Sequence, residues 1–122
     1  MWPFRSAPPE PGLRIWYDVG AHFVDADAAV PLAPREVAVH AAKVAEAQGR
    51  FIGFVDARET VIQAMNDGHD RFHVERPLPD RGGSLATVVD RDRFLAICSE
   101  ISAPLAYYAE TLGLEFEPWS QQ

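Results

Sequence analysis

Three extended segments follow one another with almost no chain between them, and this spacing constrains the fold more than any other feature of the sequence. The segments are RFIGFVD (50–56), ETVIQAMN (59–66) and RFHVERP (71–77), separated only by AR and DGHD. Runs rich in branched and aromatic residues are typical of strands. Connections this short join antiparallel neighbours, because a parallel pair needs a crossover of a dozen residues or more. With SLATVV (84–89) as a fourth strand, the sequence predicts an antiparallel β-meander over about residues 50–89.

Helical patterns flank this meander on both sides. PREVAVHAAKVAEAQ (34–48) begins with a proline that suits the first turn of a helix and is followed by Gly49, which ends it. RDRFLAICSEI (91–101) can be capped by Asp90 or Asp92, and a further helix is expected over 102–112 with Ser102 as its N-cap. The apolar positions at helical spacing in the first two helices are Val37, Ala41, Val44 and Ala45, then Phe94, Leu95, Ile97, Cys98 and Ile101.

The remaining segments complete a single domain over residues 1–122. LRIWYDV (13–19) reads as an earlier strand, 20–34 as a loop and LEFEPW (114–119) as a short last strand, while the prolines of 1–12 indicate an irregular arm. A meander whose helices group together belongs to the α+β class. We expect the helices to pack on one face of the sheet and to cover Ile62, Ala64, Phe72 and Val74 or their neighbours in the pleat.

Composition and charge narrow the class of function. Apolar residues make up 48% of the chain, which is enough for a packed core. Eighteen acidic against eleven basic residues give a net charge of −7, which repels nucleic-acid phosphates and anionic lipid. We therefore expect no direct nucleic-acid binding, and the absence of a long apolar run or a signal-peptide pattern predicts a cytoplasmic protein away from membranes. The single cysteine, Cys98, excludes an intramolecular disulfide framework and is expected to be a buried thiol.

The stretch NDGHDRFHVE (66–75) carries the densest set of chemically active side chains. His69 and His73 stand four apart beside Asp70, a spacing that brings two histidines onto one metal only in a helix. Gly68 and the flanking strand pattern predict a hairpin instead, with His69 in the turn and His73 in the strand. Asp90 and Asp92 follow a glycine turn as in nucleotidyltransferases, but they stand where a helix cap is wanted. We expect no catalytic residue, cofactor or metal.

Alternation along the meander separates two faces. Val61, Gln63 and Met65 share one face of their strand, and His73 and Glu75 share one face of the next. A mixture of polar and apolar side chains is common on protein-binding surfaces, and it also occurs on a solvated antiparallel face. Both interpretations stay open at this point.

Several turn and strand residues over 53–84 resemble a known group of proteins. The resemblance is carried by GFVD (53–56), by Thr60 and Gln63, by VERP (74–77) with Pro79, and by GGS (82–84). Together they resemble small, acidic, single-domain bacterial immunity proteins of polymorphic toxin systems. The resemblance covers about a quarter to a third of the chain and implies a protein that acts by binding rather than by catalysis.

These observations predict a non-enzymatic protein that neutralises a cognate toxin through an acidic surface. The expected partner is a protein with a basic toxin domain, because complementary charge accelerates association. The alternatives are a small enzyme or metal-binding domain that uses His69, Asp70 and His73, and a homodimeric scaffold. The residues expected to bind the partner are Asp25, Asp27, Asp56, Glu59, Gln63, Met65, Asp67, Asp70, His73, Glu75 and Asp80.

Overall fold

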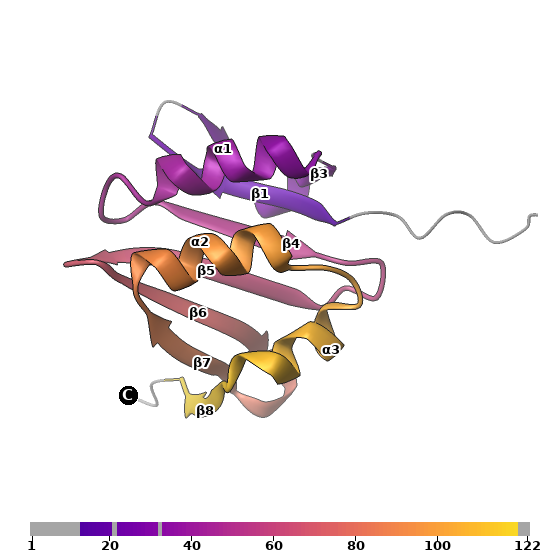
Figure 1. Cartoon of the computed structure of the whole chain (residues 1–122). Helices are drawn as coiled ribbons and strands as arrows, with labels where there is room; N and C mark the ends of the chain where they lie inside the picture. Colours follow the sequence, from indigo (N-terminus) through magenta and orange to yellow (C-terminus); the bar gives the residue numbers. More distant parts are fainter. Residues whose placement is uncertain (1–12, 21, 32, 120–122) are drawn as a thin grey trace, which may run out of the picture.

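The described part of the chain is built around one antiparallel sheet (Figure 1). A computed structural model describes residues 13–20, 22–31 and 33–119, so the expected arm over 1–12 lies outside the described residues. The strands follow the order β2-β1-β4-β5-β6-β7-β8, and β3 also pairs with β1. Their bounds are β1 (Arg14–Asp18), β2 (Phe23–Val24), β3 (Val30–Pro31), β4 (Phe51–Val55), β5 (Val61–Gly68), β6 (Arg71–Leu78), β7 (Gly83–Val89) and β8 (Glu115–Pro118).

The predicted meander is confirmed as the run β4-β5-β6-β7, and every pairing within it is antiparallel. The sheet is wider than the meander, because β1 pairs with β4 and β8 pairs with β7. The segment over 20–34, which we expected to be a loop, contains the two short strands β2 and β3. Each is two residues long and pairs with β1, so this edge of the sheet is covered by short pieces of strand.

The helices lie on one face of the sheet, as the α+β prediction required (Figure 1). The described helices are α1 (Pro34–Val44), α2 (Arg91–Glu100) and α3 (Leu105–Ala109), with short 3₁₀ turns η2 (Ala26–Ala28), η3 (Pro79–Arg81) and η4 (Glu110–Leu112). None of the described helices combines the length and the apolar character needed to cross a bilayer.

The core fills the space between these helices and the sheet. Ile62, Ala64, Phe72 and Val74 are buried there, as predicted from the pleat. Phe72 of β6 stacks on Phe94 of α2 with ring centroids 4.4 Å apart. Burying a side chain of this size contributes about 1.5–3 kcal/mol, so contacts of this kind hold α2 against the sheet.

Two helix boundaries differ from the sequence prediction. We expected the first helix to reach residue 48, but α1 ends at Val44, whose carbonyl accepts a 3.0 Å hydrogen bond from the side chain of Asn66 in β5. The last helix begins at Leu105, three residues after the expected N-cap Ser102. There the N–H of Leu105 donates to the side chain of Asp56 at 2.8 Å. In both places a residue distant in sequence bonds the backbone of the helix end, and no local pattern reveals such a partner.

Candidate functional site

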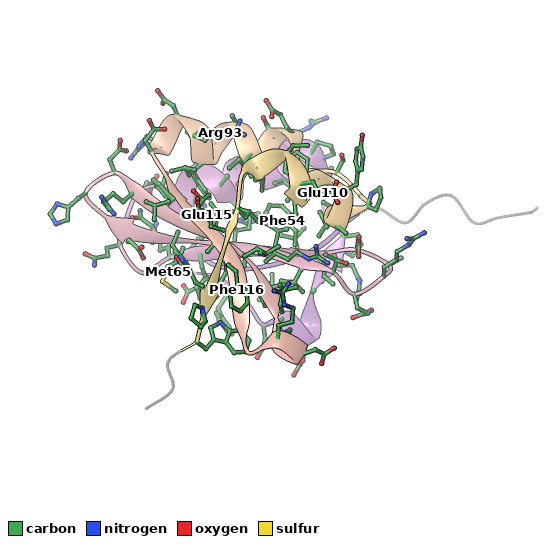
Figure 2. The ribbon with its side chains drawn as sticks, turned by 90° about the horizontal axis from the view of Figure 1, so that it is seen from below. Phe54, Met65, Arg93, Glu110, Glu115 and Phe116 are labelled. Carbon is green, nitrogen blue, oxygen red and sulfur yellow. The ribbon has the colours of Figure 1, made fainter. Side chains whose placement is uncertain are left out.

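The face of the sheet opposite the helices brings apolar side chains from several strands into one row. Phe51 of β4 pairs with Met65 of β5, Met65 pairs with His73 of β6, and His73 pairs with Val88 of β7. Residues paired across an antiparallel sheet point to the same face. Figure 2 shows Phe54 on the side of the helices and Met65 on the opposite side. We call this second surface the helix-free face.

The row continues across β1 to the edge of the sheet. Asp18 pairs with both Phe51 and Phe23, and the rings of Phe23 and Phe51 meet at right angles with centroids 6.4 Å apart. Phe23 is 59% exposed, Met65 44% and Val88 43%. We call Phe23, Phe51, Met65 and Val88 the apolar row. In the register Asp18 stands between Phe23 and Phe51, and His73 stands between Met65 and Val88. Exposed apolar side chains that gather on one face in this way mark interaction surfaces more often than isolated ones do.

A second row on the same face runs beside the apolar row. It contains Trp16, Gly53, Gln63, Glu75 and Ala86, each paired with the next across the strands. The indole of Trp16 lies across Gly53 so closely that a Cβ at this glycine would clash with the ring. Trp16 is only 7% exposed, so it forms part of the floor of the face rather than a protruding contact.

A small depression lies where the two rows meet. It has a volume of about 130 Å³ and is lined by Phe51, Gln63, Ala64, Met65, His73 and Glu75. The side-chain amide of Gln63 donates a 2.6 Å hydrogen bond to Oε2 of Glu75, which fixes the carboxylate at the wall. We call this feature the Phe51–Glu75 depression.

The C-terminal strand adds carboxylates to this face. Glu115 pairs with Ala86 and Glu117 pairs with Ser84, so both follow the pleat of the helix-free face. Oε1 of Glu117 lies 3.4 Å from Nε2 of His73. Trp119 follows β8, and its indole N–H donates to the hydroxyl of Ser84 at 3.0 Å. These contacts hold the end of β8 against the sheet and place its acids beside the apolar row.

The structure brings some of the expected partner-binding residues together and separates others. Gln63, Met65, His73 and Glu75 share the helix-free face, as the alternation predicted. The other exposed acids are spread around the rim: Asp25 and Asp27 in the connection between β2 and β3, Glu59 and Asp80 in loops at one end of the sheet, and Asp67 and Asp70 at the other end.

Asp56 was wrongly expected to contact a partner. Its side chain is buried, at 2% exposure, and accepts three backbone hydrogen bonds. Oδ1 accepts from the N–H groups of Arg58 and Thr60, both at 3.0 Å, and Oδ2 accepts from Leu105 at 2.8 Å. Asp56 therefore ties the β4–β5 connection to the start of α3 and is a structural residue.

The hairpin between β5 and β6 separates the side chains that the metal or enzyme alternative needs together. His69 and Asp70 are its two turn residues, with φ of 55° and 62°, and Gly68 before them has φ of 85° at a bulge in β5. His69 and Asp70 line a depression of about 310 Å³ whose wall includes Phe72 and Arg91, on the side of the helices. His73 lies on the other face. Within 13–20, 22–31 and 33–119, no group of three or more His, Cys, Asp or Glu side chains is placed to hold a metal ion.

The remaining sequence candidates have structural roles. Cys98 is a buried thiol, as predicted, and burial raises its pKa to about 12, so it stays protonated at neutral pH. Asp90 is confirmed as the N-cap of α2, where its carboxylate accepts the N–H of Arg93 at 2.9 Å.

Several residues of the helix-free face were not predicted, because alternation within one strand does not reveal its partners. Phe51 pairs with Met65, and Val88 pairs with His73, so all four side chains point to the same face. This relation can be recognised only when the register between the strands is known. Phe23 lies in a segment that we expected to be a loop, and no periodic signal marked it.

Comparison with known proteins does not extend these observations. No protein-family model matches the chain, and no curated protein or solved structure is significantly similar to it. The resemblance of residues 53–84 to immunity proteins therefore stays a prediction.

Proposed function

We propose that this chain is a non-enzymatic binding protein that docks a basic protein domain on the helix-free face of its sheet. The observation that carries the proposal is the apolar row, whose exposed members Phe23, Met65 and Val88 lie on the one face that the described helices leave uncovered. An interface of this kind has an apolar centre and a polar rim. The apolar row supplies the centre, and the neighbouring carboxylates supply the rim.

Charge supports a basic partner. The chain carries a net charge of −7, and the strand register places Asp18, Glu75, Glu115 and Glu117 on the helix-free face. Complementary fields steer two proteins together and discriminate against acidic competitors. Domains that act on nucleic acids need Lys and Arg to hold phosphates, so a toxin domain of this class presents the surface that this face complements.

The proposed consequence of docking is neutralisation. A basic cleft covered by an acidic protein is closed to its own anionic substrate. The resemblance of residues 53–84 to immunity proteins of polymorphic toxin systems is in line with this role. Neutralisation requires no reaction by the chain itself, since binding alone occupies the cleft.

The test is capture of a partner with a matched pair of baits. Met65 on the helix-free face is 44% exposed and Val39 on α1 is 51% exposed, so Met65→Glu and Val39→Glu introduce the same charge at similar exposure on different surfaces. We expect the wild type and Val39→Glu to capture the same Lys/Arg-rich protein from an extract of the source organism, and Met65→Glu to lose it. Equal capture by both variants, or capture of an acidic protein, would overturn the proposal.

Light scattering after size-exclusion chromatography distinguishes this function from the homodimeric scaffold. We expect the wild type, Met65→Glu and Val39→Glu all to be monomers. A wild-type dimer that Met65→Glu dissociates and Val39→Glu does not would mean that the face binds a second copy of the chain, and would refute the proposed function.

A further inference from the structure

We propose that the Phe51–Glu75 depression receives one arginine side chain of the partner. This inference rests on the proposed function and deepens it, because it assigns the ligand group of the site as a guanidinium. The depression lies between the apolar row and the acidic rim, where a long side chain with an apolar stem and a cationic head finds both kinds of contact.

The size of the depression suits a side chain rather than a free cofactor. Its volume of about 130 Å³ falls well below the ~300–1,000 Å³ of pockets that enclose small-molecule ligands. It also opens on the exposed side chain of Met65, whose flexible thioether packs readily against methylene groups. A single protruding side chain of a docked protein fits these dimensions.

The walls of the depression favour a planar cation. The Glu75 carboxylate is oriented by the 2.6 Å hydrogen bond from Gln63, which uses one of its roughly four acceptor positions. The remaining positions match the parallel N–H donors of a guanidinium, which binds carboxylates through two hydrogen bonds at once. Phe51 contributes an aromatic ring held at right angles to Phe23, and a guanidinium stacks on such a ring more readily than an ammonium does.

The charges around the depression oppose an anionic ligand. His73 lines the wall, and its Nε2 lies 3.4 Å from a carboxylate oxygen of Glu117. Glu75 lines the depression and the Glu117 carboxylate lies next to the His73 ring of its wall, so both carboxylates would repel a phosphate or carboxylate ligand. The same two carboxylates attract a cation, so the preference of the depression for a positively charged ligand depends on more than one residue.

Arginine binding can be measured on the isolated protein without its partner. The probe is N-acetyl-L-arginine amide, and its control is N-acetyl-L-citrulline amide, which has nearly the same shape without the charge. Titration into ¹⁵N-labelled protein should give saturable amide shifts concentrated at Phe51, Gln63, Met65, His73 and Glu75 with the arginine probe. The citrulline probe should bind at least about tenfold more weakly than the arginine probe, because it lacks the charge-assisted hydrogen bonds.

Two variants make the result specific to this depression. Glu75→Gln keeps the shape of the side chain and can still accept from Gln63, so the fold is preserved and only the charge is lost. Glu115→Gln removes a charge from the same face at a residue that does not line the depression. We expect Glu75→Gln to weaken arginine binding by about tenfold, and Glu115→Gln to change it by less than about twofold. Phe51→Leu should also weaken it, since the ring is removed while the volume stays similar.

The inference is overturned by shifts that do not saturate, by equal affinity for the two probes, or by equal effects of Glu75→Gln and Glu115→Gln. Any of these results leaves the Met65→Glu and Val39→Glu capture experiment unaffected. Loss of capture by Met65→Glu without an arginine site would keep the docking surface and discard its ligand group.

Discussion

Replacing Asp56 should destabilise the fold far more than replacing any exposed acid. The carboxylate accepts hydrogen bonds from Arg58, Thr60 and Leu105, at 3.0, 3.0 and 2.8 Å. A hydrogen bond to a charged group contributes about 1.5–3 kcal/mol, and a buried N–H left without a partner costs about 1–3 kcal/mol. Water can reach the loop N–H groups of Arg58 and Thr60 more easily than the buried one of Leu105. We therefore expect Asp56→Ala to lower the free energy of unfolding by about 3–5 kcal/mol.

Asp56→Asn separates the contribution of the two carboxylate oxygens. The amide retains an oxygen for Arg58 and Thr60 but turns its NH₂ group toward the N–H of Leu105, so the link to α3 is lost. Asp56→Asn should lower the free energy of unfolding by less than Asp56→Ala and by more than Asp80→Ala. Asp80 is exposed, and its variant is the control that should stay within about 0.5 kcal/mol of the wild type. Urea denaturation followed by tryptophan fluorescence measures all three. An Asp56→Ala protein within about 1 kcal/mol of the wild type would refute the structural role.

Three further results are expected at other sites. His40 stacks on Tyr17 at 4.0 Å, and burial, with Lys43 and His22 nearby, lowers its pKa in the folded state. The unfolded chain therefore binds a proton at His40 more readily than the folded chain, so the free energy of unfolding should fall as the pH drops below about 6.5. His40→Phe keeps the stacked ring and should reduce this loss. Denaturation curves recorded between pH 7 and 5 measure the difference. Replacing the positive-φ turn residues between β5 and β6, as His69→Asn with Asp70→Gly, should raise the free energy of unfolding by about 1 kcal/mol. A destabilised double variant would contradict this expectation and would mean that side-chain contacts, such as the 3.9 Å approach of Asp70 to Arg91, outweigh the backbone strain. Cys98, with a pKa of about 12, should resist a thiol reagent at pH 8 until urea unfolds the chain, and rapid labelling of the folded protein would contradict its burial.

Much of the sheet was predictable from local pattern. The short connections around the meander indicated antiparallel pairing, and the alternation in ETVIQAMN and RFHVERP placed Gln63, Met65, His73 and Glu75 on one face. That assignment depends only on the two-residue period of a strand, which the structure follows up to Asn66. The bulge at Gly68 then shifts the register, so Asp67 and Gly68 belong to β5 and the turn falls on His69 and Asp70.

The features that could not be predicted depend on partners distant in sequence. Asp56 looked like an ordinary turn acid, and its buried partner Leu105 follows 49 residues later. The early end of α1 at Val44 is bonded by Asn66 from a strand. Phe23 joins the apolar row because β2 pairs with β1 and β1 pairs with β4. Such register choices are made by the packed core, and a single sequence carries no local trace of them.

The affinity of the captured partner for two double-alanine variants tests the docking surface most directly. Phe23→Ala with Met65→Ala removes two exposed side chains of the apolar row, and Val39→Ala with Tyr107→Ala removes two exposed side chains from α1 and α3. Buried apolar anchors at the centre of an interface each contribute more than about 1 kcal/mol when they are hot spots. Isothermal titration calorimetry should therefore show the first pair weakening binding by at least about tenfold, with the second pair unchanged within about twofold. An unchanged dissociation constant for Phe23→Ala with Met65→Ala, or a larger loss for Val39→Ala with Tyr107→Ala, would contradict docking on the helix-free face.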